Sequence, residues 1–259
     1  MVRAEPTRIR SVARAVGLLL WVAGEQGPRT ASNASRALGL PLATTHHLLN
    51  TLVAAGMLAK DAKREYHLGP KVGALTDAFQ REVFPPDYLL APLRHLADAS
   101  GETAHLTAWR HGEIVILTSV DGTHAVRVAR LHSGLEGGGH ARAAGKLLLA
   151  VAAPKMRDAY LAAHPLEPLT ERTICSRDEL DAEFARIQEQ GYAVDEEEFA
   201  PGVACVAAPI VVDGFPIGAY GISAPLGRFR DRRVWLIDTV LSAASAGASV
   251  VPADAADAA

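Results

Sequence analysis

The sequence is poor in cysteine, and this scarcity argues against two ways of holding a small domain together. Its 259 residues include two cysteines, Cys175 and Cys205, which lie far apart and form no Cys-x-x-Cys pair. We therefore expect neither disulfides nor a structural zinc site, and a cytoplasmic location fits this usage. Apolar cores must hold the fold together instead, and 49% of the residues are hydrophobic.

Long apolar runs and export signals are also lacking. The run 15–23 is shorter than the roughly 20 residues that a membrane-spanning helix needs. No signal-like cleavage site follows the opening segment MVRAEPTRIR, so we expect no signal peptide. The run fits better in an amphipathic first helix, with one apolar face formed by Val12, Ala15, Val16, Leu19 and Leu20.

Motifs of common enzyme and metal sites are incomplete. The segment from Gly139 to Gly145-Lys146 has the wrong spacing for a phosphate-binding loop, and Leu147 stands where such a loop needs Ser or Thr. Residues 221–225, GISAP, lack the second glycine of a nucleophile elbow. Metal-ligand spacing is not readable either. A hydrolase or acyl-transfer domain stays open as a second hypothesis, to be judged by turnover.

Residues 30–58 carry the pattern of two helices joined by a tight turn. Gly39 can adopt the left-handed conformation that ends a helix, and Pro41 suits the start of the next one. The second helix has one apolar face, formed by Thr45, Leu48, Leu49, Leu52 and Val53. This pattern predicts a helix-turn-helix, which places its second helix in the DNA major groove.

A charged segment, 60–65, follows between two short apolar runs, as in the β-hairpin of a winged helix. A solvated surface loop is the alternative interpretation. Charge favours the wing, because residues 1–72 hold ten basic and four acidic side chains, a formal balance of +6, whereas the remainder sums to −9. A basic segment suits phosphate contact and argues against a module that binds only protein.

The rest of the chain predicts an α+β domain with an antiparallel sheet. A linker helix is expected over 71–81, ended by Pro85-Pro86. Strands are expected over 102–109, 114–119, 126–129, 192–195, 204–211 and 216–223. Helices are expected over 88–99, 141–151, 155–163, 178–190 and 231–246.

A set of short segments occurs in one order along nearly the whole chain. It comprises residues 11–15 (SVARA), 39–41 (GLP), 66–69 (YHLG), 140–141 (HA), 145–146 (GK), 169–170 (LT), 191–197 (GYAVDEE), 202–209 (GVACVAAP) and 222–225 (ISAP). As a set, these segments resemble the IclR family of bacterial transcription regulators. No single segment is specific.

The resemblance implies four parts: a winged helix-turn-helix domain (1–70), a linker helix (71–86), an effector-binding domain with a GAF- or profilin-like antiparallel sheet (87–251) and a flexible tail (252–259). Such proteins are dimers or pairs of dimers. We expect an inverted-repeat operator on double-stranded DNA and no membrane partner, cofactor or metal. The expected function is ligand-responsive repression of a catabolic or metabolic operon, with activation as the alternative.

On the DNA side the expected contact residues are Arg8, Arg10, Thr44, His46, His47, Lys63 and Arg64. The family usually carries basic residues at positions 42 and 47, where this chain has Leu42 and His47. This departure weakens direct guanine readout by an arginine and shifts the contacts toward the wing, the N-terminal arginines and DNA shape. Exposure without a DNA role is the alternative for His46 and His47.

On the effector side the resemblance implies a pocket formed by Arg142, Ala143, Ala144, Asp195, Val203, Cys205, Gly221 and Ser223. Most relatives have a small hydroxyl residue where this chain has Arg142. An arginine at a helix start could clamp a carboxylate with two hydrogen bonds. We therefore expect a carboxylate effector, and the small residues leave room for an aromatic one. Pairing of Arg142 with an internal acid, or its exposure to solvent, stays open.

Overall fold

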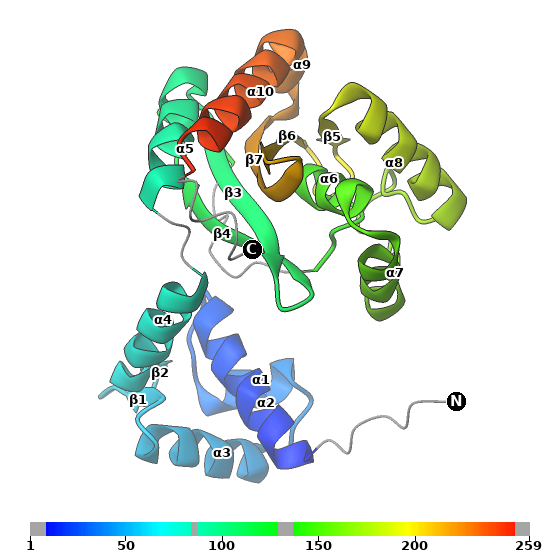
Figure 1. The fold of residues 1–259 in the computed structure, drawn as a ribbon. Helices are drawn as coiled ribbons and strands as arrows, with labels where there is room; N and C mark the ends of the chain where they lie inside the picture. Colours follow the sequence, from blue (N-terminus) through cyan, green and yellow to red (C-terminus); the bar gives the residue numbers. More distant parts are fainter. Residues whose placement is uncertain (1–8, 84–86, 129–136, 252–259) are drawn as a thin grey trace. The chain divides into compact units, whose positions relative to one another are not determined.

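The computed structural model describes residues 9–83, 87–128 and 137–251. The chain divides into two compact units, Met1–Glu82 and Val83–Ala259, which are described separately (Figure 1). The predictions for Arg8, Pro85-Pro86, Ala129 and the tail lie outside the described residues. No helix within the described ranges is long and apolar enough to cross a membrane.

The N-terminal unit is a winged helix-turn-helix, as predicted. Its elements are α1 (Arg10–Gly24), α2 (Ala31–Ala37), α3 (Leu42–Ala54), β1 (Leu58–Lys60), β2 (Tyr66–Leu68) and α4 (Pro70–Val83). Gly39 has a φ of +61°, which allows the sharp turn between α2 and α3. In α3 the predicted apolar face packs inward, with Thr45 and Leu49 fully buried.

The face predicted for α1 is wrong for three of its five residues, whereas Leu19 packs against the core as predicted. Val12, Val16 and Leu20 are 57%, 50% and 66% exposed, whereas Leu18 and Val22 are buried. Helix α1 is apolar on more than one side, so periodicity alone does not say which side packs. The side of α1 that is buried depends on the elements around it. The core of the unit consists of Leu18, Val22, Ala31, Ala34, Leu49, Leu58 and Tyr66.

The C-terminal unit is built on a five-stranded antiparallel sheet of order β4-β3-β7-β6-β5. Its strands are β3 (Thr103–Arg110), β4 (Glu113–Val120), β5 (Ala193–Glu196), β6 (Val203–Val212) and β7 (Phe215–Pro225). Its helices are α5 (Asp87–Ser100), α6 (Ala143–Val151), α7 (Pro154–Ala163), α8 (Arg177–Gln190), α9 (Leu226–Asp231) and α10 (Arg233–Ser249). The predicted α+β class is confirmed.

Side chains that alternate along the strands give this sheet two different faces. One face packs Leu106, Val206 and Ile222 against the buried sides of α5 and α10. The opposite face packs smaller residues such as Ala207 and Ala219 against α6 and α8 (Figure 1). Small residues on this second face leave space between the sheet and the start of α6.

One predicted strand of this unit is wrong. Residues 126–128 form no strand, because side chains bind their carbonyls: Arg228 donates to Val126 at 2.7 Å, and Thr103 donates to Val128 at 2.6 Å. The predicted helix 231–246 is confirmed as α10, and the short helix α9, which was not predicted, precedes it. The break falls at Arg232, whose φ of −121° departs from helical geometry.

Candidate effector site and DNA-binding surface

A row of polar side chains crosses the sheet face that looks toward α6. Register places Thr103 of β3 opposite Ser223 of β7, Ser223 opposite Cys205 of β6, and Cys205 opposite Asp195 of β5. Four residues that are far apart in the sequence therefore form one line across four strands. The sulfur of Cys205 lies 3.1 Å from the Ser223 hydroxyl oxygen.

A cavity of about 330 Å³ lies between this sheet face and the N-terminal end of α6. Seven of the eight predicted effector residues line it: Arg142, Ala143, Ala144, Asp195, Val203, Cys205 and Ser223. Its remaining wall comes from His105, Thr107, Ile116, Val128, Gly145, Phe199 and Ala200. The sequence prediction missed these residues. The alternation of polar Thr103, His105 and Thr107 with apolar neighbours was the signal that could have found the β3 wall.

Gly221 is the predicted effector residue that does not line the cavity. It pairs with His105 across β3 and β7. A Cβ atom at position 221 would lie 2.2 Å from the His105 Cε1 atom, far inside van der Waals contact. The missing side chain of Gly221 therefore makes room for the imidazole that does line the cavity.

Arg142 brings a cation to the cavity from the residue just before α6. It is 8% exposed, so the solvent-facing alternative is wrong. Its guanidinium donates to the Ile114 carbonyl at 3.4 Å and lies 5.8 Å from the centre of the Phe199 ring. Burial lowers the Arg142 pKa, while Tyr160, Cys205 and Asp195 oppose that shift. Arginine stays charged in proteins, so the cavity holds a positive charge.

Asp195 fixes the turn that follows β5 rather than facing the cavity freely. Its Oδ1 atom accepts hydrogen bonds from the backbone N–H groups of Glu198 and Phe199, at 2.7 and 3.3 Å. Its Oδ2 atom is covered and has no hydrogen-bond partner among the described residues. Burial raises the Asp195 pKa to about 6, although the two backbone bonds and the Lys146 charge act in the opposite direction.

A buried lysine stands behind the cavity. Lys146 of α6 is fully buried, and its ammonium donates to Glu183 of α8 at 3.1 Å and to Glu198 of the turn after β5. Glu183 also pairs with Arg186, which reaches out to solvent. This cluster ties α6 and α8 to the turn that Asp195 holds, so it determines how the cavity wall is placed.

The side chains that line the cavity are poorly suited to covalent or metal chemistry. Burial, with the nearby Asp195 charge, raises the pKa of the Cys205 thiol well above its usual range, so the reactive thiolate is scarce. Cys205 is therefore poorly suited to act as a nucleophile. Within the described ranges, no three His, Cys, Asp or Glu side chains gather in a geometry that could hold a metal ion.

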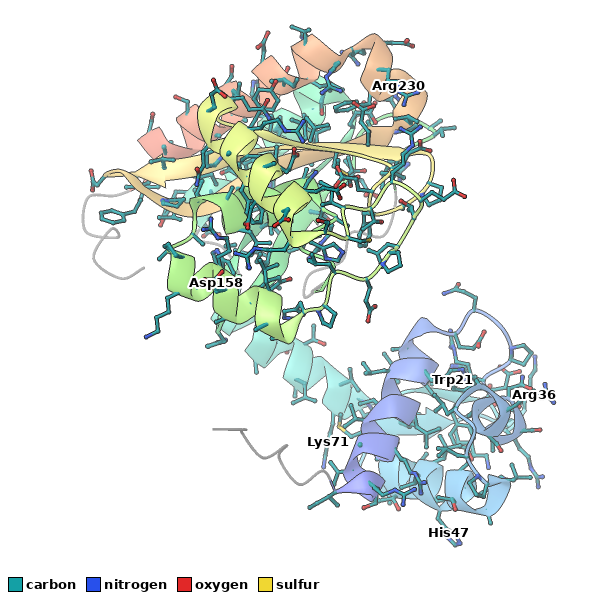
Figure 2. The ribbon with its side chains drawn as sticks, turned by 90° about the vertical axis from the view of Figure 1, so that its right-hand side faces the viewer. Trp21, Arg36, His47, Lys71, Asp158 and Arg230 are labelled. Carbon is teal, nitrogen blue, oxygen red and sulfur yellow. The ribbon has the colours of Figure 1, made fainter. Side chains whose placement is uncertain are left out.

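In the N-terminal unit the predicted DNA-contacting residues lie on the surface. His46 and His47 of α3 are exposed, Thr44 is half-buried, and Arg10 is exposed at the start of α1. Figure 2 shows His47 pointing away from the unit. The outer side of α3 is therefore polar and accessible over the positions that a recognition helix uses.

The wing is held rigid by its own acidic residue. Asp61 accepts from the Glu65 N–H at 2.9 Å, and its other oxygen lies 3.1 Å from the His67 imidazole. These hydrogen bonds lower the Asp61 pKa, the backbone bond having the larger effect. Lys63 and Arg64 are exposed at the tip, and Arg64 adopts a positive φ of 64°. Both side chains are free to approach phosphate groups.

Comparisons with known proteins agree with both units. The model for the IclR helix-turn-helix domain matches residues 11–62, and that for the bacterial transcriptional regulator IclR C-terminal region matches residues 88–248. The HTH-type transcriptional regulator BhcR of Paracoccus denitrificans is 32% identical over 239 residues, which cover 91% of this chain and 85% of that protein. The transcriptional repressor IclR of Escherichia coli is 29% identical, covering 88% and 84%.

Solved structures share the fold. An IclR homologue of Microbacterium hydrocarbonoxydans, crystallised as a complex with 4-hydroxybenzoate, has a TM-score of 0.71 to this chain at 22% identity, covering 93% of this chain and 98% of that one. The matched family models together span most of the sequence, including the helix-turn-helix and the sheet that carries the cavity. The chain therefore belongs to the IclR family of bacterial transcriptional regulators, in which a DNA-binding domain is joined to an effector-binding domain.

Proposed function

We propose that this regulator represses a metabolic operon and that a small carboxylate, of aromatic type, is its effector. The observation that carries the proposal is the buried Arg142 guanidinium at an otherwise mostly apolar cavity. A carboxylate can bind a guanidinium through two parallel hydrogen bonds, which are stronger than those between neutral groups. The name of the Escherichia coli relative, a transcriptional repressor, supports repression rather than activation.

Three features of the cavity and one relative support an aromatic acid. Ala143 and Ala144 present the first turn of α6, where backbone N–H groups and the helix dipole favour an anion. The Phe199 ring and the small alanine side chains give an apolar wall. The volume of about 330 Å³ lies at the lower end of the range for small-molecule pockets. A related regulator of the same fold was crystallised with 4-hydroxybenzoate.

The effector proposal is tested by removing the guanidinium. Isothermal titration with a panel of aliphatic and aromatic carboxylates should give binding to the wild type, weakened at least tenfold in Arg142→Ala. Arg94→Ala is the matched control, because Arg94 is exposed on α5, which covers the opposite face of the sheet. Equal affinity in wild type and Arg142→Ala would refute the carboxylate clamp.

On the DNA side we propose that Arg10, Thr44, His46, His47, Lys63 and Arg64 contact an inverted-repeat operator. A homodimer, or a pair of dimers, would place two α3 helices in successive major grooves. The exposed outer side of α3 and the basic wing tip support this assignment. Footprinting beside the protein's own gene should show two protected half-sites at low salt. Absence of protection by the folded protein would refute it, and a reporter gene would separate repression from activation.

A further inference from the structure

His105 is the polar residue of the cavity that the effector proposal leaves unused. It lies on β3, is 5% exposed, and lines the cavity beside Thr107. Its ring lies against the backbone of Gly221 on β7, where any side chain would collide with it. The imidazole therefore occupies a place that exists because residue 221 is glycine.

One imidazole nitrogen is committed and the other is available. Nδ1 lies 3.3 Å from the Thr107 hydroxyl oxygen, and Nε2 makes no hydrogen bond with any residue in the described ranges. Burial, helped by the Arg142 charge, lowers the His105 pKa to about 4, so the ring is neutral near pH 7. A neutral imidazole has one donor and one acceptor, and the rotation of the Thr107 hydroxyl determines which one Nε2 is.

The other polar groups of the cavity are less available to a ligand. The Cys205 thiol and the Ser223 hydroxyl lie at hydrogen-bond distance from each other. Asp195 uses Oδ1 for two backbone N–H groups, and its Oδ2 atom is covered. Nε2 of His105 is thus the neutral hydrogen-bonding atom that remains for a second polar group of the effector.

The chemistry of that second group follows from its neighbours. A cationic group is disfavoured, because Arg142 is close enough to depress the His105 pKa. A hydroxyl can both donate and accept, so it suits either tautomer of the imidazole. We infer that the effector is a hydroxylated aromatic acid, whose carboxylate binds Arg142 and whose hydroxyl hydrogen-bonds to His105 Nε2. This inference rests on the proposed function and makes His105 the residue that distinguishes hydroxylated from unsubstituted acids.

The test compares benzoate with 2-, 3- and 4-hydroxybenzoate by isothermal titration. The wild type should bind one hydroxylated isomer about three- to tenfold tighter than benzoate, the effect of one net hydrogen bond. His105→Phe keeps a ring over Gly221 but removes both nitrogens. It should lose the preference, so that benzoate and the hydroxylated isomer bind this variant with similar affinity. Gly221→Ala, which displaces the imidazole, should lose the preference as well.

His95→Phe is the matched control, because it makes the same replacement at an exposed residue of α5, which covers the opposite face of the sheet. It should retain the preference, and thermal denaturation of each variant checks that the fold is intact. The inference is overturned if the wild type binds all four acids equally, if none of them binds, or if His105→Phe keeps the preference. The proposed carboxylate clamp is judged separately, by Arg142→Ala and the wider panel that includes aliphatic acids.

Discussion

The two units of this protein use charge in opposite ways. In the described part of the N-terminal unit no charged side chain is buried, and Thr45 is the buried polar residue. The basic residues predicted to contact DNA are exposed there. The C-terminal unit buries charged groups instead, among them Glu102, Arg142, Lys146, Glu183 and Asp195. Two recognition tasks explain the contrast.

DNA offers a continuous line of phosphates, and exposed cations can reach it without being enclosed. A small molecule offers few groups, so it must be surrounded and separated from water to be distinguished from others. Enclosure removes water from the protein's own charges too, and each buried charge then needs a partner. Glu102 meets this need through Arg228, which donates to it at 2.7 Å, and Lys146 through two glutamates.

The largest expected effect comes from removing the buried lysine. Lys146→Met should lower the free energy of unfolding of the C-terminal unit by about 3–5 kcal/mol, because it leaves Glu183 and Glu198 buried without this cation. Urea denaturation followed by circular dichroism measures the change. Lys155→Met, on the exposed side of α7, should change stability by less than about 0.5 kcal/mol. Equal effects would break the contrast between buried and exposed charges.

The second expected effect is on the pH dependence of stability, and it comes from the buried Asp195. The Asp195 pKa is about 6 in the folded protein and 3.8 for the ordinary group, so between these values the folded state binds more protons. The stabilisation is therefore complete below about pH 4 and is lost as pH rises through 6, a change of roughly 3 kcal/mol. Asp195→Asn should remove this part of the pH dependence, because an amide does not titrate in this range. The turn should be kept, since the amide oxygen can still accept the two backbone N–H groups.

Denaturation midpoints between pH 4 and pH 8 measure this difference. The stability of Asp195→Asn relative to the wild type should increase with pH. Asp98→Asn, on the exposed side of α5, should keep the wild-type profile. Parallel profiles for the wild type and Asp195→Asn would show that the Asp195 carboxyl titrates alike in the folded and unfolded states.

The smallest expected effect concerns an exposed charge of the N-terminal unit, Lys63. Lys63→Ala at the wing tip should weaken binding to operator and to unrelated DNA alike, and should reduce the slope of log affinity against log salt by about 1. Protein stability should stay within about 0.5 kcal/mol of the wild type, because the side chain is exposed. Fluorescence anisotropy across a salt series measures this. An unchanged slope would remove Lys63 from the phosphate contacts.

Much of the fold was predictable because its signals are local. The turn at Gly39, the apolar face of α3 and the hairpin around 60–65 each depend on residues close in sequence. Predictions failed where a segment's partner is distant. The packing face of α1 is chosen by Leu49 and Tyr66, and residues 126–128 are held by Arg228 and Thr103 rather than by a neighbouring strand.

The residues of the candidate site also divide into those that short sequence segments indicate and those that only distant contacts reveal. Family resemblance pointed to Arg142, Asp195 and Cys205, because the last two lie in recognisable short segments and Arg142 lies between two of them. His105 stands in no such segment, and its role depends on the register of β3 against β7, which lies more than a hundred residues further along the chain. The close fit between His105 and Gly221 is a tertiary contact that spacing along one strand cannot reveal.

By itself the sequence determined the class of this protein, its helix-turn-helix and the separation of a basic N-terminal segment from an acidic remainder. These properties follow from periodicity, turn residues and charge counts, which are local or additive. Tertiary structure alone decided which face of α1 is buried, that Gly221 supports His105, and which polar atoms the cavity leaves available. The physical reason is that burial, with the pKa shifts it causes, depends on neighbours that the antiparallel sheet brings together from distant parts of the chain.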